Sequence, residues 1–313
     1  MNEKPLVSVI MSCYREKISH FCLALESILN QTYDNLEILL VIDDPGNKGL
    51  ITAAEGYAAI DSRIRLIRNQ ENLGLTASLN KGIGLSTGQF ICRMDSDDIS
   101  EYSRIDEQLR YLSDNDLDLV GCFLSVIDDD SNHLYNVTNI PTKSRSIARA
   151  LWHNNCVPHP TWFGKAVVFD QKYRNVPCAE DYDFLLRAVR NGFAIGNVPK
   201  ILFNYRLSEG SISRSNLYEQ FLIACALRSG EGNDNTLDSI NQFVAKRFDE
   251  NHANRYSEAN RLFNHSMALF GDHKPFRSLL GLLRIPITSL SYCLNMWNMA
   301  IVVFIAALDS FSN

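Results

Sequence analysis

The sequence predicts an α/β fold in which a mostly parallel sheet is covered by helices on both faces. In the first half of the chain, short apolar runs of strand length alternate with segments of helical periodicity. The runs are apolar on both faces, which is typical of strands buried between two layers of helices. The chain has 313 residues. This is enough for one domain of about 200 residues and a further segment.

The elements of the first half follow in a regular order. Strands are expected at residues 6–11, 36–42, 64–67, 90–94 and 117–126. Helices are expected at residues 18–29, 75–85 and 104–112. In the first of these helices, Phe21, Leu25 and Ile28 are spaced to share one face. Ligands of such sheets bind at the carboxyl ends of the strands, so the loops that follow the strands are the first place to look for a site.

The second half is less regular and then becomes helical. Residues 132–176 contain Pro141, Pro158 and Pro160 with scattered aromatic residues, and we expect a small mixed sheet that forms one wall of the site. A helix is expected at 180–190 and a strand at 201–206. No strand pattern follows Ser215. We therefore predict an α/β domain at 1–215 and an α-helical C-terminal region at 216–313.

The composition argues against nucleic-acid binding. The chain has 36 acidic and 30 basic residues, a formal charge of -6, and so lacks a dense basic footprint. Its eight cysteines form no CxxC pair, and several lie in apolar runs, so we expect reduced core residues in a cytoplasmic protein. The first residues show no signal-peptide pattern.

The C-terminal tail has a different character. Lys274, Arg277 and Arg284 precede the run 285–308, whose purely apolar part, 299–308, is too short to span a bilayer. Three interpretations remain open. The tail can lie along a membrane surface as a basic-flanked amphipathic segment, it can pack on the protein body or a second subunit, or it can span the membrane.

The densest chemical signal follows the strand at 90–94. Asp95, Asp97 and Asp98 place three carboxylates within four residues. Clustered like charges are costly to desolvate, and a divalent cation removes that cost. Mg²⁺ and Mn²⁺ favour one or two carboxylates together with substrate phosphates. The alternative is a solvated turn in which Asp98 caps the next helix.

Two further acidic groups stand at the ends of predicted elements. Asp43 and Asp44 follow the strand at 36–42, where a carboxylate can accept a hydrogen bond from a uracil N–H or a ribose hydroxyl, although Asp-Pro-Gly is also good turn chemistry. Glu180, Asp181 and Asp183 open a helix. Capping and the helix dipole favour acidic residues there, and a catalytic base is the functional alternative.

The order of these segments resembles the family 2 glycosyltransferases, which have the GT-A fold. The likeness covers roughly residues 5–215. The segments that carry it are 7–15, 25–33, 37–44, 72–75 with 80–82, 95–98, 180–181 and 205–206 with 211–213. In that family, segments of these kinds form the nucleotide loop, the acidic pair of the second strand, the DxD metal motif, the catalytic acidic pair and the segment that closes over the donor phosphates.

The resemblance implies a role for each candidate residue. The donor-binding set would be Ser12, Tyr14, Arg15, Asp43, Asp44, Asn72, Gly74, Asn80, Asp95 and Arg206. Asp97 and Asp98 would hold Mn²⁺ or Mg²⁺ against the diphosphate, and Asp181 would take the proton of the acceptor hydroxyl. His159 and Glu180 would lie on the acceptor side. The donor would be a nucleotide-diphosphate sugar, specifically a UDP-sugar, and the anomeric centre would be inverted.

The resemblance also implies a class of acceptor and a location in the cell. A glycan or lipid-linked acceptor, as in cell-surface polysaccharide or glycolipid synthesis, fits a cytoplasmic enzyme with peripheral contact at the inner face of the plasma membrane. The Gln-x-x-Arg-Trp motif of processive enzymes is missing, which favours one sugar per encounter.

The sequence departs from the family pattern at two places, and two alternative functions remain. Pro45-Gly46 replaces the usual turn after the acidic pair, and Ser78-Leu79 replaces Ala-Arg in the third helix. A sugar-phosphate nucleotidyltransferase would carry a glycine-rich loop where Ser12 to Arg15 stand. A degenerate nucleotide-sugar-binding protein would have lost an acidic motif, and all three are present.

Overall fold

The computed structural model describes residues 4–207, 216–229, 237–271 and 275–311. Its centre is a nine-stranded sheet with the order β3-β2-β1-β4-β8-β6-β9-β5, and β7 pairs with β6. The strands are β1 Val7–Cys13, β2 Leu36–Ile42, β3 Ile64–Arg68, β4 Phe90–Asp95, β5 Ile99–Ser100, β6 Leu119–Ile127, β7 His133–Val137, β8 Phe163–Lys165 and β9 Ile195–Arg206. Strands β3, β2, β1 and β4 are parallel, as are β6 and β9, while β8 joins the two groups in antiparallel pairing.

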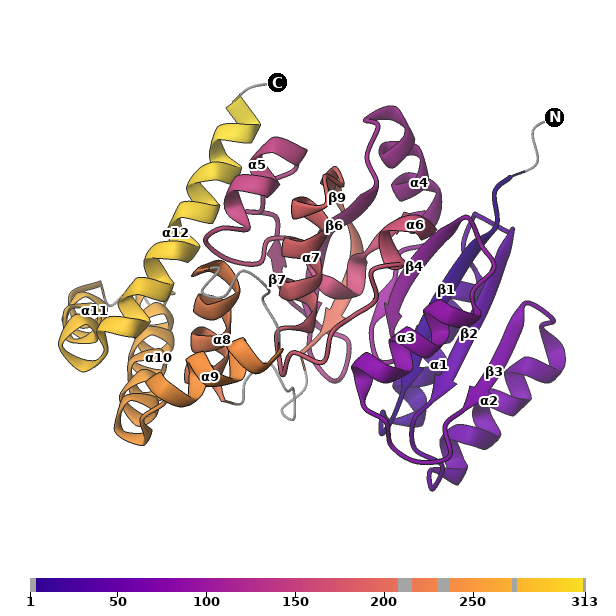
Figure 1. Cartoon of the computed structure of the whole chain (residues 1–313), viewed down its shortest axis with the longest axis horizontal. Coiled ribbons are helices and arrows are strands. Elements are labelled where there is room, and N and C mark those ends of the chain that lie inside the picture. Colours follow the sequence, from indigo (N-terminus) through magenta and orange to yellow (C-terminus); the bar gives the residue numbers. More distant parts are fainter. Residues whose placement is uncertain (1–3, 208–215, 230–236, 272–274, 312–313) are drawn as a thin grey trace.

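Helices cover both faces of the sheet (Figure 1). In the first two thirds of the chain they are α1 Ile18–Leu29, α2 Lys48–Ile60, α3 Leu75–Leu85, α4 Arg104–Asp114, α5 Ser144–Ala150, α6 Ala166–Phe169 and α7 Glu180–Arg190, with a 3-10 turn at His159–Thr161. In β1, Ile10 points to the core cluster that contains α3, and Val9 and Met11 point to the cluster that contains α1. The alternation explains why the strands are apolar on both faces. The predicted α/β fold is confirmed.

Helix α2 and strand β9 differ from the prediction, and the short strand β5 was not expected. Helix α2 was not expected, because its apolar face is thin and only Leu50 and Ala54 are buried. Strand β9 begins six residues before the expected position, at Ile195. Its register against β6 shifts opposite Cys122 to Leu124, and Pro199 lies in the exposed part of the strand. A bulge tolerates proline, which explains why the sequence pattern shows only the second part of this strand.

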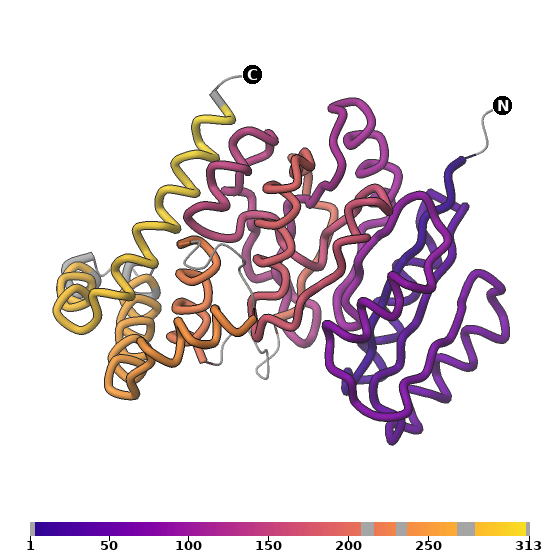
Figure 2. Tube along the Cα trace, viewed as in Figure 1, coloured from indigo at the N-terminus to yellow at the C-terminus, as the bar shows by residue number. Residues whose placement is uncertain are grey.

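Five helices form the C-terminal region within the described ranges, and they lie at one end of the molecule (Figure 2). They are α8 Leu217–Ser229, α9 Leu237–Arg247, α10 Glu250–Gly271, α11 Pro275–Thr288 and α12 Leu290–Phe311. Ile223 and Leu227 of α8, Ile240 of α9 and Val302 of α12 share a core cluster with the buried face of α7. The helical region is therefore packed against the α/β part.

The final helix is longer than the apolar run suggested. Helix α12 is continuous over 22 residues and contacts α5 (Figure 1). Within the described ranges it is the one helix long and apolar enough to cross a membrane by length and composition, and 11% of its apolar window is buried. The tail was expected to be too short to span a bilayer, but helix α12 is long enough. Its contacts with the rest of the protein are therefore needed to choose between a surface-lying, a packed and a spanning helix.

Candidate active site

The site lies at the carboxyl edge of the parallel strands. Ser12 of β1 pairs with Asp95 of β4, and Cys13 pairs with Ile42, the last residue of β2. The sheet register therefore brings the end of the first strand, the DxD motif and the Asp43-Asp44 pair to one edge.

Asp98 is a fully buried carboxylate, and one of its two oxygens has no hydrogen-bond partner among the described residues. Its Oδ1 accepts a hydrogen bond from the backbone N–H of Arg206 at 2.6 Å. Its Oδ2 is buried and has no hydrogen-bond partner among the described residues. Burial and then the charge of Asp95 raise the pKa of Asp98 well above its usual value. A buried, unpaired carboxylate oxygen is costly unless a cation or donor completes it.

Asp97 lies beside this group and is half-buried. Burial, followed by the charge of Asp95, raises the pKa of Asp97 to about 7. No cluster of three His, Cys, Asp or Glu side chains in the described part of the chain could hold a metal on its own. Asp97 and Asp98 still fit the coordination preference of Mg²⁺ and Mn²⁺, which bind to few protein carboxylates and complete their coordination shell with phosphate and water.

Arg206 holds the DxD motif in place. Its Nε donates to the carbonyl oxygen of Asp97 at 2.8 Å, and its Nη1 donates to the carbonyl oxygens of Asp128 and Asp129 at 2.9 and 3.0 Å. The side chain is buried. Its Nη2 is buried and has no hydrogen-bond partner among the described residues, so the expected contact of Arg206 with donor phosphates stays a prediction. The neighbouring segment 211–213 lies outside the described residues.

The Asp43-Asp44 pair divides into an inner and an outer carboxylate. Asp43 is buried and accepts hydrogen bonds from the backbone N–H groups of Leu73 and Gly74, at 2.9 and 2.8 Å. Asp44 is more open and accepts from Gly46 N and Arg15 Nε at 3.0 and 3.3 Å. Asp43 thus fixes the loop before α3, and Asp44 is the carboxylate that remains accessible.

The other donor-side residues surround this loop. Arg15 is exposed and stacks over the ring of Tyr14, 4.7 Å from its centroid. Asn72 is exposed, and its Oδ1 accepts from the N–H of Gly74, which has a positive φ of 82°. A glycine suits that backbone conformation.

Asn80 is committed to the protein. Its side chain makes two hydrogen bonds with the backbone of Tyr173, at 2.9 and 2.8 Å, and so ties α3 to the segment before α7. Between these elements lies a cavity of about 220 Å³. It is lined by Leu73, Gly74, Leu75, Thr76, Ala77, Asn80, Tyr173 and Asn175.

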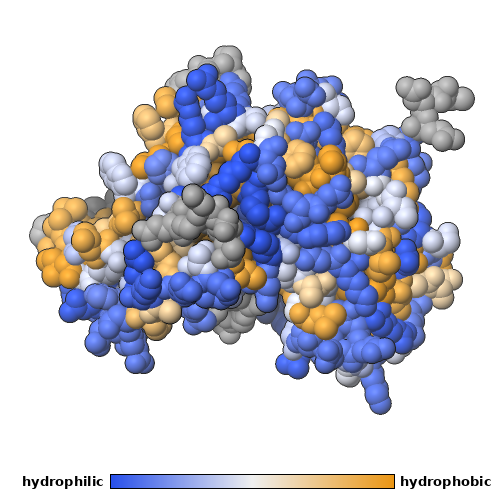
Figure 3. Space-filling view, viewed as in Figure 1, coloured by the Kyte–Doolittle hydropathy of each residue, from blue (hydrophilic) through white to orange (hydrophobic). Residues whose placement is uncertain are grey.

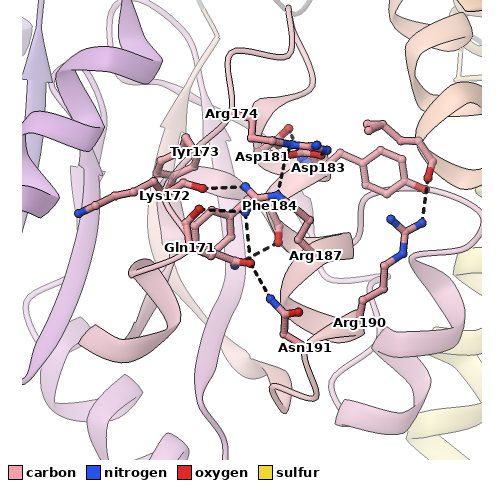
Figure 4. A network of polar contacts seen from close by, with 12 residues as sticks. Gln171, Lys172, Tyr173, Arg174, Asp181, Asp183, Phe184, Arg187, Arg190 and Asn191 are labelled. Atoms are coloured by element: carbon pink, nitrogen blue, oxygen red, sulfur yellow. Dashed lines mark hydrogen bonds and ion pairs between the residues drawn. The ribbon is translucent and has the colours of Figure 1, made fainter. Parts of the chain in front are cut away.

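The three carboxylates at the start of α7 have separate roles. Asp183 is buried and forms ion pairs with Arg174 and Arg187 (Figure 4), which fixes the preceding segment to the helix. Asp181 accepts hydrogen bonds from Asn155 Nδ2 at 2.8 Å and from its neighbour's backbone N–H at 2.6 Å. Glu180 is half-buried at the first position of the helix.

Glu180 and Asp181 behave as a coupled pair near the DxD motif. Burial, followed by the charge of Asp181, raises the pKa of Glu180 to about 7, and the charge of Asp95 contributes in the same direction. Burial also raises the pKa of Asp181. The charge of Asp95 therefore raises the pKa values of both Asp97 and Glu180, as is expected when two acidic motifs face one site. Such paired carboxylates with raised pKa values are typical of acid–base catalysis.

Comparison with known proteins decides the family. The sequence profile described as glycosyl transferase family 2 matches residues 8–172, more than half of the chain. A glycosyltransferase of Haemophilus influenzae, itself uncharacterized, is 33% identical over 232 residues, which cover 70% of this chain and 71% of that protein. This chain belongs to glycosyl transferase family 2.

Another relative and two solved structures are also similar to this family 2 glycosyltransferase. The O-antigen biosynthesis glycosyltransferase WbnJ of Escherichia coli is 30% identical over 68% of this chain and 84% of its own length. A structure of S. aureus TarS with UDP-GlcNAc has a TM-score of 0.59 at 15% identity and covers 96% of this chain and 90% of that one. The mannosyltransferase PcManGT of Pyrobaculum calidifontis, solved with GDP-Man and Mn²⁺, has a TM-score of 0.58 at 15% identity, covering 99% and 88%. The GT-A fold is confirmed.

One charged residue of this glycosyltransferase lies beside the acidic motifs but was not among the predicted site residues. Arg93 is a buried guanidinium in β4. Its Nη1 donates to Asp95, and its Nε is buried without a partner among the described residues. Its charge lowers the pKa values of the two DxD carboxylates and of the α7 pair against the effect of burial. The signal was an arginine inside an otherwise apolar strand, directly before the acidic motif.

His159 lies deeper in the glycosyltransferase than expected. It is buried, its Nε2 lies 2.9 Å from the Tyr173 hydroxyl, and its ring packs edge-on against Trp162. Burial and the charge of Arg93 hold its pKa well below the usual value, so the imidazole is neutral. The side chain supports the wall beneath the site, and its place on the acceptor side stays a prediction. Its position between two prolines gave no sign of this burial.

Proposed function

We propose that this glycosyltransferase moves a sugar from a UDP-sugar to an acceptor hydroxyl, with inversion and with a divalent metal. The observations that carry the proposal are the buried, unpaired Asp98 Oδ2 and the acidic pair Glu180 and Asp181, whose pKa values are raised by burial. Solved proteins of the same fold bind UDP-GlcNAc, and GDP-Man with Mn²⁺, which supports a nucleotide-sugar donor.

The donor nucleotide would bind over the ends of β1 and β2. Asp44 is the accessible carboxylate of its pair and would accept a hydrogen bond from uracil or ribose. Tyr14 and Arg15 form a stacked pair beside it and, with Ser12, would bind the base and the phosphates. Asn72 and Gly74 would line the same region through the loop that Asp43 fixes.

Asp97 and Asp98 would hold Mn²⁺ or Mg²⁺, with Asp95 nearby. Such a metal offsets the charge that develops on the departing diphosphate. The residues fit the ion because Asp98 Oδ2 is buried without a partner and because burial, followed by the negative charge of Asp95, raises the pKa of Asp97. Arg206 and Arg93 would position this motif, Arg206 through the backbone of Asp97 and Arg93 through Asp95.

Asp181 would accept the proton of the acceptor hydroxyl. Asn155 and the backbone N–H of Tyr182 orient the carboxylate, and each oxygen keeps a further lone pair for the acceptor. Glu180 would lie on the acceptor side. A base and a leaving group on opposite faces of the sugar produce inversion.

The acceptor would be a glycan or a lipid-linked glycan, and the enzyme would act in the cytoplasm, at the inner face of the plasma membrane. The O-antigen relative supports a role in cell-surface polysaccharide or glycolipid synthesis. Asn80 would act indirectly, by fixing α3 against the wall that contains Tyr173.

Thermal unfolding tests the donor site directly. UDP-, GDP- and dTDP-sugars would each be added with Mn²⁺ or with EDTA, since a ligand that binds only the folded state raises the melting temperature. We expect a rise with UDP-sugars that disappears in EDTA. A rise with GDP-sugars alone would replace the donor assignment. No rise with any donor would favour a degenerate protein that has lost the donor site, or an enzyme that binds its acceptor first.

A further inference from the structure

Helix α12 presents a continuous apolar stripe to solvent. Leu290, Leu294, Trp297, Phe304 and Leu308 are all more than half exposed. Helical periodicity places residues at such three-, four- and seven-residue intervals on one side of the helix. The sequence has no charged residue from Leu290 to Leu308. A stripe of this size is unusual on a monomeric soluble protein and indicates a binding surface.

The opposite side of α12 is tied to the catalytic part of the protein. Asp309 is buried, and its carboxylate accepts hydrogen bonds from the backbone N–H groups of Thr142 and Lys143 at 2.9 and 3.1 Å and from Ser146 Oγ at 2.5 Å. These donors lie at the start of α5, where a negative charge is favoured by the helix dipole. A helix that left the body to span a bilayer would lose these bonds.

Further contacts fix the middle of the same helix. Asn298 Oδ1 lies 3.3 Å from His153 Nδ1, in the loop after α5. Val302 is buried in the core cluster that contains α7. The helix is therefore held along its length, and its exposed stripe faces outward from a fixed position.

Helix α11 extends the apolar surface. Leu279, Leu280, Leu283 and Ile287 are each more than half exposed. Figure 3 shows hydrophobic side chains gathered at this end of the molecule, over α11 and along α12. We call the exposed residues of the two helices the apolar end face. Its members are Leu279, Leu280, Leu283, Ile287, Leu290, Leu294, Trp297, Met299, Val303, Phe304 and Leu308.

The charge of this region differs from that of the whole protein. In the sequence, residues 274–311 contain three basic residues, Lys274, Arg277 and Arg284, and one acidic residue, Asp309. Among the side chains that the structure describes there, Arg284 is exposed and Asp309 is buried. The region is thus net positive in a chain whose formal charge is -6. Basic residues beside an apolar helical face are typical of segments that lie on anionic lipid.

We propose that the apolar end face docks on an anionic lipid surface, with α12 lying in the plane of the interface and not crossing the bilayer. The helix of 22 residues is about 33 Å long, so it could span by length alone. Its bonds to α5 exclude that arrangement without unfolding of the contact, and they leave the stripe free for shallow insertion. The occupant is lipid and not a second copy, because a second copy would bring the same basic region against itself.

Vesicle sedimentation tests the proposal with the full-length protein. Vesicles of phosphatidylglycerol and phosphatidylcholine would be compared with vesicles of phosphatidylcholine alone. We expect binding to the anionic vesicles, weakened by salt. The double variant Trp297→Glu/Phe304→Glu should bind about 100-fold more weakly, since each large apolar side chain removed from lipid costs about tenfold.

Controls separate the other outcomes. Ile60→Glu alters an equally exposed apolar residue in α2, at the far end of the molecule, and should bind like the wild type. Unchanged binding of the double variant would overturn the proposal. Retention on the vesicles after alkaline carbonate extraction would show a spanning helix and would also overturn it. Absence of vesicle binding with a dimer that the double variant dissociates would identify a second copy as the occupant. None of these readouts depends on transferase activity, so they stand or fall separately from the proposed reaction.

Discussion

The backbone N–H of Arg206 donates to Asp98 Oδ1 at 2.6 Å, while Asp98 Oδ2 stays buried and unpaired among the described residues. The last residue of β9 therefore fixes the orientation of the Asp98 carboxylate. The fold leaves one oxygen of a charged group available, and the cost of its burial is offset when a cation binds. This pair connects the sheet topology to the proposed metal site.

Replacement of Asp98 by Asn should weaken metal-dependent donor binding. The asparagine side chain keeps an oxygen for the N–H of Arg206 but loses the negative charge. We expect donor affinity in Mn²⁺ to fall by about tenfold or more, with no change in EDTA. Isothermal calorimetry with a UDP-sugar measures this. Asp116→Asn is a matched control, because Asp116 is exposed and its positive φ of 49° suits Asn. Equal affinities of wild type and Asp98→Asn in Mn²⁺ would remove Asp98 from the metal site.

Replacement of Asp181 by Asn should abolish transfer and leave donor binding intact. The variant keeps the shape of the side chain but cannot accept a proton, and general bases contribute about 100-fold to 10,000-fold in rate. Turnover and donor affinity would be measured on the same preparation. A variant that turns over at the wild-type rate would disprove the assignment, and one that loses donor affinity would point to a structural role for Asp181.

The strands, most helices and the position of the acidic motifs could be predicted from sequence, because burial on both faces leaves a strong apolar pattern. The boundaries of α1, β2, α3 and α7 are as predicted. Helix α2 was missed because an amphipathic pattern is hard to see when only two of its residues are buried. The domain boundary at 215 stays a prediction, since residues 208–215 lie outside the described ranges.

The roles of individual site residues were less predictable, because sequence shows which groups are present and not where their hydrogen bonds go. Arg206 and Asn80 were expected at the donor, and the structure shows that both also form hydrogen bonds with backbone groups, although Arg206 Nη2 has no partner among the described residues. His159 was expected at the acceptor side, yet it is buried against Tyr173. Each difference follows from long-range pairing that a single sequence does not display.

Replacement of Glu180 by Gln should change the pH dependence of stability. The pKa of Glu180 is raised to about 7. An exposed Glu has a pKa of about 4.3. Between these values the folded state binds a proton that the unfolded state has released, so the stability from this group is present at low pH and is lost as pH rises through about 7. Gln removes the titration. We expect similar melting temperatures near about pH 5 and a higher melting temperature for the variant near about pH 8, both in EDTA.

A matched control is Glu71→Gln, since Glu71 is exposed. This substitution measures the effect of a Glu-to-Gln change at an exposed position outside the site. Parallel melting curves for wild type and Glu180→Gln across the range would mean that Glu180 is ionised in the folded protein at all these pH values.

Two replacements of Arg93 should distinguish the contribution of its charge from the contribution of its packing in the site. Arg93 supplies the positive charge beside Asp95 and lowers the pKa values of both acidic motifs. Arg93→Met keeps much of the apolar volume and removes the charge, so the carboxylates lose their common counter-ion. We expect the turnover number at saturating donor to fall by about tenfold or more, as for groups that orient metal ligands. Arg93→Lys keeps the charge and should recover part of that turnover. Arg93 would have a purely structural role if Met and Lys lowered the melting temperature alike and left the turnover number unchanged.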